Sequence, residues 1–134
     1  MKDKIILSTN KREELVDITQ QVESKIEKSG IKEGICHIFV KHASAAITIN
    51  ENYDPNISDD LLNLLRKTIP QGKWKHDIVD GNGDAHLKSA IIGPSICVPI
   101  TNGQMELGRW QSIMFCEFDG PRSNREIVLR IISD

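Results

Sequence analysis

The sequence predicts an α+β fold, an antiparallel β-sandwich with two main helices, in a single domain covering residues 1–134. Three observations lead to this prediction. Most apolar runs are short and strand-like, and only two segments space their apolar residues as a helix does. The dipeptide Asn102-Gly103 between two such runs is typical of a hairpin, and therefore of antiparallel pairing. No repeat, low-complexity tract or linker divides the chain.

The first third of the chain predicts a strand, a helix and further strand. Residues 4–9 form the expected strand, and residues 15–26 carry apolar side chains at helical spacing, although the first of them also fit a strand. Two capping-box patterns, beginning at Asn10 and at Asp17, compete for the start of this helix. We expect it to end at Gly30, because glycine readily takes the left-handed conformation that closes a helix.

The middle of the chain predicts more strand and the second helix. Residues 34–41 and 45–49 are rich in Ile, Phe and Val, which indicates two strands or one long bent strand. Asp54-Pro55 is a good helix opening, since Asp caps free amides and Pro fits the first helical position. Pro70 ends this helix. Its apolar stripe consists of Ile57, Leu61, Leu64, Leu65 and Thr68.

The last part of the chain predicts a loop followed by strands. Residues 71–84 are polar and glycine-rich, which indicates a long loop of the kind that often carries function. The expected strands are residues 95–100, 104–118 and 125–132. Their connections are the turns at Asn102-Gly103 and at Asp119-Gly120-Pro121.

Composition excludes several classes of protein. Lys plus Arg (17) nearly balance Asp plus Glu (19), so the chain lacks the broad basic face of a nucleic-acid-binding protein. No apolar run approaches the ~20 residues that span a membrane, and the N-terminus lacks a signal-peptide pattern. We therefore expect a cytoplasmic protein without membrane contacts. Cys36 and Cys97 should be reduced core thiols, and Cys116 beside Glu117 lacks the neighbouring cation of a nucleophile.

Three of the four histidines are candidates for metal ligands. His42, His76 and His86 fall at strand ends or in the polar loop, where distant segments can converge. Three neutral imidazoles with one open position are the arrangement of a catalytic zinc site. No tight spacing motif links them, so exposed loop histidines are the alternative. His37, inside a strand, is expected to be structural.

Many polar residues lie near these histidines in the sequence. Asp80-Gly81-Asn82-Gly83-Asp84 resembles the start of a calcium loop, but no Glu follows at the twelfth position, and a simple turn explains it as well. Arg109 and Arg122 offer guanidinium forks to a phosphate or carboxylate, unless they belong to the solvent face of a strand. The other polar candidates are Ser44, Asn50, Glu51, Asn52, Asp54 and Gln111.

Several ordered blocks of the chain resemble the YjbQ-type family. They are residues 42–46, 48–52, 74–76, 82–87, 107–111 and 117–122, so the resemblance covers essentially the whole chain. It implies an α+β fold built around a β-sandwich, a homotrimer, and a cleft in which His42, His76 and His86 hold a metal. It also implies the name secondary thiamine-phosphate synthase, which reflects a weak activity of the family.

These observations together predict a metal-dependent enzyme acting on a small phosphorylated metabolite. A divalent metal, zinc, would be held by His42, His76 and His86. Asp84 or Glu51 would act as general acid or base. The alternatives are a metal-dependent hydrolase of a phosphorylated or damaged metabolite and a non-catalytic trimeric ligand-binding protein. The expected substrate contacts are Ser44, Asn52, Arg109 and Gln111.

Overall fold

A computed structural model describes all residues, 1–134, and confirms the α+β class with two antiparallel sheets. It holds three α-helices where the sequence predicted two main ones. The elements are β1 (Lys2–Leu7), β2 (Glu14–Asp17), α1 (Thr19–Ser29), β3 (Gly34–Val40), β4 (Ala45–Glu51), α2 (Pro55–Thr68), the 3-10 helix η1 (Lys75–Ile78), α3 (Gly83–Ile92), β5 (Ser95–Thr101), β6 (Gln104–Met105), β7 (Gln111–Glu117) and β8 (Arg125–Ser133).

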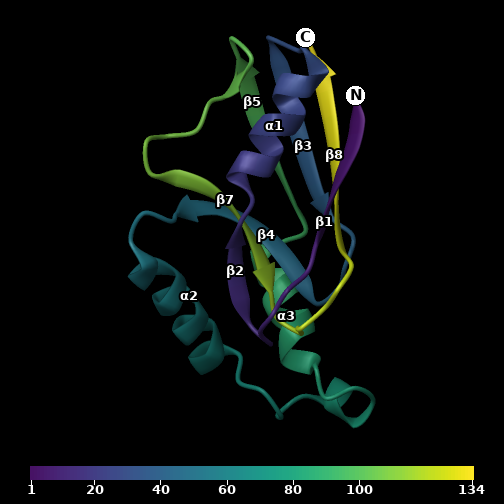
Figure 1. Ribbon diagram of the computed structural model, residues 1–134. Coiled ribbons are helices and arrows are strands. Elements are labelled where there is room, and N and C mark those ends of the chain that lie inside the picture. Colours follow the sequence, from purple (N-terminus) through teal and green to yellow (C-terminus); the bar gives the residue numbers. More distant parts are fainter.

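The two sheets share one hydrophobic core. The larger sheet has the order β1-β8-β3-β5-β6 and the smaller one β2-β7-β4. Lys2 pairs with Arg130, so the first and last strands are neighbours and both termini lie at the same end of the molecule (Figure 1). Alternate residues of both sheets pack with α1 into a single cluster, to which Val22, Ile38 and Phe115 belong. This shared core is what the predicted sandwich requires.

Of the two predicted starts for the first helix, the structure agrees with the later one, at Asp17. Residues 14–17 form β2, which pairs with β7 through Leu15 and Cys116, so the start at Asn10 is wrong. Asp17 instead lies beside the helix start, where its Oδ1 accepts hydrogen bonds from the backbone N (2.9 Å) and Oγ1 (2.6 Å) of Thr19. Gly30 has a φ of 72° and ends the helix as predicted.

The second helix begins as the sequence predicted. Asp54 accepts a hydrogen bond from the backbone N of Asn56 at 2.9 Å, and Pro55 is the first helical residue. Leu65 is buried, but Leu64 of the predicted apolar stripe is exposed. Leu62, which was not in the predicted stripe, is buried, so the buried face of α2 is rotated from the predicted one. With α3 and the smaller sheet it builds a second core cluster, which consists of Ala46, Leu62, Leu65, Ala85, Cys116 and Phe118.

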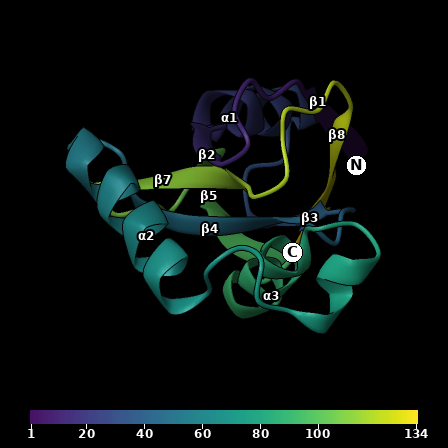
Figure 2. The ribbon, with the colours of Figure 1, turned by 90° about the horizontal axis from the view of Figure 1, so that it is seen from below.

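The predicted loop at residues 71–84 is ordered into helical turns. It contains η1 and the first residues of α3, the helix that the sequence did not predict. Figure 2 shows α1 and α3 on opposite sides of β4. No helix in the chain is long and apolar enough to cross a lipid bilayer.

The strand prediction for the last third is correct except for one segment. Asn102 (φ 54°) and Gly103 (φ 78°) form the tight turn after β5, and both positive values are those of a type I′ hairpin. The predicted strand 104–118 is interrupted by an irregular loop between β6 and β7.

The three thiols are free, but only two are core residues. Burial raises the pKa of Cys36 and of Cys116 to about 12, which keeps both as inert thiols. Cys97 is exposed, which corrects the prediction that it is buried. Its neighbour Val98 points into the core, and because side chains alternate along a strand, Cys97 points outward.

Candidate functional site

Two of the three candidate histidines meet at one end of the molecule. The rings of His76, from η1, and His86, from α3, have their centroids 4.7 Å apart and stand almost perpendicular, at 85°. Asp77 joins the two elements: its Oδ2 accepts a hydrogen bond from the backbone N of Trp74 (2.9 Å) and its Oδ1 one from that of Gly83 (2.8 Å). The histidine pair is thus held by a backbone clamp.

The absence of a side chain at Gly83 is what allows this close approach. A Cβ at this position would lie 2.8 Å from Cβ of Trp74 and 2.9 Å from Oδ1 of Asp77. Trp74 is fixed in turn by a 2.7 Å hydrogen bond from its Nε1 to the carbonyl oxygen of Pro70. Glycine at residue 83, which the sequence presented as a turn signal, therefore serves helix packing.

A cavity of about 620 Å³ opens beside the histidine pair. The polar side chains that line it are two lysines, Lys73 and Lys75, and the two imidazoles, and no carboxylate lines it. An aromatic ring and a leucine supply apolar wall. Such a cavity suits a small molecule that carries an anionic group and a planar or apolar part. The lining residues are Lys73, Trp74, Lys75, His76, Gly83, His86 and Leu87.

His42 is engaged elsewhere. Its Nε2 accepts a hydrogen bond from the backbone N of Glu126 at 2.8 Å. Burial and the charge of Arg125 lower the pKa of His42, so the ring is neutral and its proton resides on Nδ1. Neither ring nitrogen then has a free lone pair for a metal. His42 shares with His86 a second cavity of about 290 Å³.

The three-histidine metal set is therefore not assembled within one chain. No group of three or more His, Cys, Asp or Glu side chains in the chain is arranged to hold a metal ion. Two imidazoles are in contact, and the nearest carboxylate is Asp80, whose Oδ2 lies 3.7 Å from Nε2 of His76. The residues present fit two ligands of the predicted three.

Asp84, a predicted acid or base, lies inside the protein rather than in a cavity. Its carboxylate accepts hydrogen bonds from Arg12 (2.9 and 3.2 Å) and from Nζ of Lys88 (2.8 Å). Burial alone would raise the pKa of Asp84, but these two cations outweigh it and lower the pKa. Lys88 also donates to Glu13 at 2.9 Å. Asp84 is thus an ionised member of a buried charge network.

Ser44, a predicted substrate contact, belongs to a second buried network. Its Oγ accepts a hydrogen bond from Nη2 of Arg125 at 3.0 Å. Arg125 also pairs with Glu117, to which Thr9 donates a hydrogen bond of 2.7 Å. These polar groups lie among buried apolar residues and satisfy one another.

The remaining predicted substrate contacts gather at the other end of β4. Glu51 is paired across the sheet with Gln111, whose Oε1 accepts a hydrogen bond from the backbone N of Gly108. Nδ2 of Asn52 donates to Asp17 at 2.8 Å. At ~3.3 Å per residue, β4 separates this end from the histidine pair by about 20 Å. One chain therefore does not bring Glu51, Asn52 and Gln111 to the histidine pair.

An exposed aromatic cluster accompanies these residues. The guanidinium carbon of Arg109 lies 4.9 Å from the centroid of the Trp110 ring, and Trp110 meets Tyr53 edge-on at 5.0 Å. We call Glu51, Tyr53, Arg109, Trp110 and Gln111 the aromatic corner. We call Lys73, Lys75, His76 and His86 the histidine end.

Sequence reasoning missed several residues of these two ends. Lys73 and Lys75 were not among the predicted site residues, although residues 74–76 are one of the blocks that carry the family resemblance, and their alternation around Trp74 was the available signal. Lys88 follows Asp84 by four residues, the spacing of a helical ion pair. Tyr53 carried no signal of its own, because its partner Trp110 is distant in the sequence.

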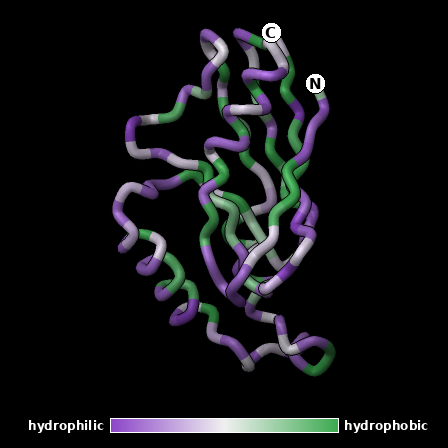
Figure 3. The backbone as a smooth tube through the Cα atoms, viewed as in Figure 1, coloured by the Kyte–Doolittle hydropathy of each residue, from purple (hydrophilic) through white to green (hydrophobic).

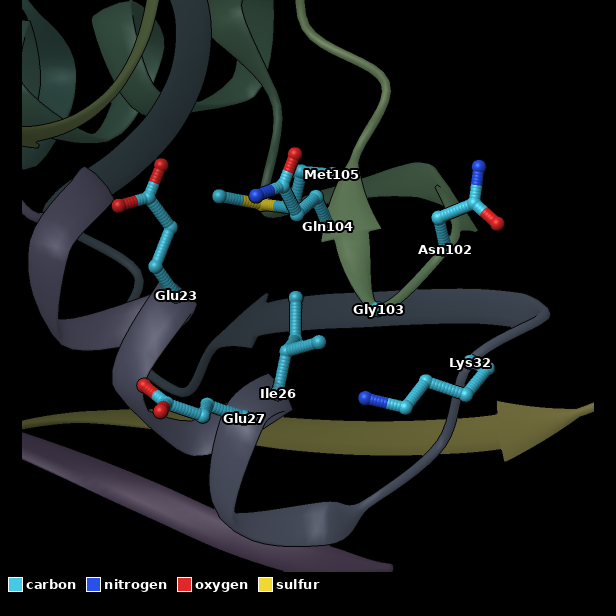
Figure 4. Close-up of a pocket in the computed structure, with 8 residues that line it drawn as sticks. All are labelled: Glu23, Ile26, Glu27, Lys32, Asn102, Gly103, Gln104 and Met105. Atoms are coloured by element: carbon cyan, nitrogen blue, oxygen red, sulfur yellow. The ribbon is translucent and has the colours of Figure 1, made fainter.

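A further cavity of about 490 Å³ lies between α1 and the β5–β6 hairpin. Figure 4 shows two glutamates of α1 and Lys32 around it, with the amides of the hairpin on the other side. Both glutamates are exposed, and none of the predicted site residues lines this cavity. It is an open surface groove without a fixed polar group.

Comparison with known proteins finds close relatives along the full length. The family model described as UPF0047 protein YjbQ-like matches residues 3–134. A UPF0047 protein of Methanocaldococcus jannaschii is 49% identical over 96% of this chain and 91% of its own. The UPF0047 protein YugU of Bacillus subtilis is 43% identical over 87% of this chain and 89% of its own.

Solved structures agree with these matches. A YbjQ-like protein of unknown function from Sulfolobus solfataricus superimposes with a TM-score of 0.96 at 43% identity, covering 100% of this chain and 97% of that one. An uncharacterized conserved protein of the yjbq/upf0047 family from Clostridium acetobutylicum gives a TM-score of 0.92 at 41% identity, with coverages of 97% and 99%.

Proposed function

The chain belongs to the UPF0047, YjbQ-like family, and we propose that it is an enzyme acting on a small phosphorylated metabolite at the histidine end. One observation carries the proposal: two imidazoles in edge-to-face contact line a cavity of about 620 Å³ that is also flanked by two lysines. Imidazole can both accept and donate a proton near neutral pH, and ammonium groups bind phosphate.

Each residue of the histidine end has a distinct part in this proposal. Lys73 and Lys75 are exposed and hold the phosphate oxygens by charge. The Trp74 ring and Leu87 contact the apolar part of the substrate. His76 and His86 exchange protons with the reacting group, and the clamp at Asp77 fixes their orientation.

Binding of a divalent metal, zinc, is a separate proposal. His76 and His86 are the residues of this chain that would bind it, and it would supply charge neutralisation for a leaving phosphate or pyrophosphate. We expect zinc binding to require this pair but not His42, because both nitrogens of His42 are committed. Elemental analysis of the wild type, His76→Ala/His86→Ala and His42→Ala tests this expectation. Zinc lost only in His42→Ala would contradict it.

Binding of inorganic pyrophosphate is the first test of the proposed function. Calorimetric titration should show binding to the wild type and at least about tenfold weaker binding to Lys73→Ala/Lys75→Ala, because two charge-assisted contacts are lost. Lys2→Ala/Lys4→Ala removes the same charge from β1 and is the matched control. Equal binding by all three proteins would refute the phosphate site.

Product analysis separates the reaction classes. A thiamine-phosphate synthase reaction would release pyrophosphate as a carbon–nitrogen bond forms, whereas a hydrolase would release phosphate or pyrophosphate with uptake of water. Tight binding without turnover would identify the non-catalytic ligand-binding alternative. The homotrimer, which the family resemblance implies, and the cytoplasmic location, which the sequence predicts, are part of the same proposal.

A further inference from the structure

Helix α3 has the reverse of the usual distribution of polar and apolar residues. Asp84 and Lys88 are 0% and 1% exposed, whereas Leu87 and Ile91 are 39% and 67% exposed. A surface helix normally turns its apolar stripe to the core and its charges to water. In α3 the inward charges are fully paired, so the apolar outer face is the part left without a partner.

The exposed apolar surface continues from α3 onto η1. Ile78 is 91% exposed, and its neighbour Val79 is exposed as well. Figure 3 colours this part of the chain, the outermost tip at the bottom of the view, as hydrophobic. We call Ile78, Val79, Leu87 and Ile91 the apolar face. Leu87 also lines the cavity of the histidine pair, and several exposed apolar side chains on neighbouring elements mark an interaction site.

The aromatic corner has the residue composition expected of a surface that binds to the apolar face. Tyr53 is 80% exposed, and Trp110 is half-exposed beneath the guanidinium of Arg109. Tyr, Trp and Arg are the residue types that most often dominate binding energy at interfaces. The three side chains are already in contact with one another, so less side-chain entropy is lost when an interface orders them.

The two surfaces complement each other in charge. Lys73 and Lys75 stand exposed at the histidine end, and Glu51 and Glu106 lie at or beside the aromatic corner with no charged partner of their own. One chain cannot bring them together, because β4 holds them about 20 Å apart. Contact between unlike surfaces of identical chains is heterologous and closes into a ring when the rotation permits.

We propose that the aromatic corner of one copy docks on the apolar face of a second copy, so that the functional site is shared between them. This deepens the proposed function and rests on it. Docking brings Arg109, Glu51 and Gln111 of one copy to the histidine pair of the next. Arg109 then joins the two lysines in binding phosphate, and Glu51 supplies the carboxylate that the buried Asp84 cannot.

Sedimentation analysis tests the docking without reference to any ligand. Ile91→Asp places a charge on the apolar face and should convert the wild-type oligomer into monomer. Ile132→Asp is the matched control, because Ile132 is also exposed but lies on the outer face of β8. It should leave the oligomer unchanged. A monomeric wild type, an oligomeric Ile91→Asp, or dissociation by Ile132→Asp alone would overturn the proposal.

Mixed oligomers test whether the site is shared. Lys73→Ala/Lys75→Ala and Arg109→Gln, which keeps an unbranched stem over Trp110, should each bind inorganic pyrophosphate at least about tenfold more weakly than the wild type. Co-expressed in equal amounts, they should regain about a quarter of the wild-type sites, since a quarter of random head-to-tail contacts pair two intact surfaces. Binding equal to the average of the two parents would overturn the shared site.

The two experiments also separate this inference from the proposed function. Wild-type binding of pyrophosphate by Lys73→Ala/Lys75→Ala would refute the function assigned to the histidine end. The sedimentation of Ile91→Asp would still decide whether the apolar face binds a second copy.

Discussion

Helices α2 and α3 both pack against the smaller sheet, but they bury opposite kinds of side chain. Helix α2 buries Leu62 and Leu65 and turns its charged residues outward. Helix α3 buries Asp84 and Lys88 and leaves Ile91 in solvent. Both contribute to the same small core cluster. The difference shows that α3 is not placed by hydrophobic burial alone.

Paired charges hold α3 where apolar contacts hold α2. Lys88 lies between Asp84 and Glu13, at 2.8 and 2.9 Å, and Arg12 completes the network at the surface. Such networks are costly to desolvate but strongly selective for one arrangement, because any other leaves a charge unpaired. We infer that the charge network fixes the orientation of α3. This matters because α3 carries His86, and the orientation of the helix decides how His86 contacts His76.

The largest effect we predict follows from breaking that network. Lys88→Ala leaves Asp84 and Glu13 without their shared cation, and removal of one partner from a buried pair costs about 3–5 kcal/mol. The free energy of unfolding, from urea denaturation at one fixed protein concentration, should fall by that amount. Lys67→Ala, an exposed lysine of α2, should change it by less than about 0.5 kcal/mol.

A small loss in Lys88→Ala would contradict the contrast between the helices. It would mean that α3 is held by its few apolar contacts, as α2 is. The variant also offers a functional reading, since a displaced His86 should weaken pyrophosphate binding even though Lys88 touches no cavity.

The same contrast predicts how the protein responds to acid. The pKa of Asp84 is lowered in the folded state from its ordinary value of 3.8, so the folded protein holds this carboxylate ionised more strongly than the unfolded chain does. Its stabilising contribution is complete above the unfolded pKa and is lost as the pH falls below it. The effect should be smaller than that of Lys88→Ala, because a protonated Asp84 still accepts hydrogen bonds from its neighbours.

Urea denaturation at pH 7 and at a series of values below pH 4 measures this dependence. Asp84→Asn should be less stable than the wild type at neutral pH but lose less stability on acidification. Asp17 makes a similar contribution, since hydrogen bonds from Thr19 and Asn52 outweigh burial and lower its pKa. An equal acid slope in wild type and Asp84→Asn would show that the network does not hold a strongly ionised Asp84.

Local signals were enough to predict the elements that fold by burial. The Asp54-Pro55 opening of α2 and the turn at Asn102-Gly103 act over a few residues and are correct in the structure. Helix α3 was not predicted because two of its buried residues, Asp84 and Lys88, are charged. Its apolar residues therefore do not recur at the spacing expected of a buried helix face. Its start also looked like a turn, and only the close approach to Trp74 explains the glycine at residue 83.

The site divided along the same line. His42, His76 and His86 were expected to converge from distant segments, and the structure brings only His76 and His86 into contact. The role of His42 depends on a hydrogen bond from Glu126, which is 84 residues away and leaves no local signal. Glu51 and Gln111 were expected beside the histidines, but Glu51 pairs with Gln111 at the far end of β4, and nothing in the sequence states how far that strand carries them.

The smallest effect we predict concerns how each helix begins. Asp54 caps α2 directly, whereas Asn82 at the start of α3 makes no capping bond and instead donates to Asp119. Asp54→Ala should therefore lower the free energy of unfolding by about 1 kcal/mol, and Asp54→Asn by only a few tenths, because Asn keeps an acceptor oxygen.

Thermal or urea denaturation of the two Asp54 variants separates capping from charge. Equal losses in both would mean that the negative charge of Asp54, and not its hydrogen bond to Asn56, stabilises α2. The start of α3 should respond to Asp77→Ala instead, since Asp77 accepts the hydrogen bond from the backbone N of Gly83. That substitution should also weaken pyrophosphate binding, whereas neither Asp54 variant should, because the clamp of α3 positions the histidine pair and the cap of α2 does not.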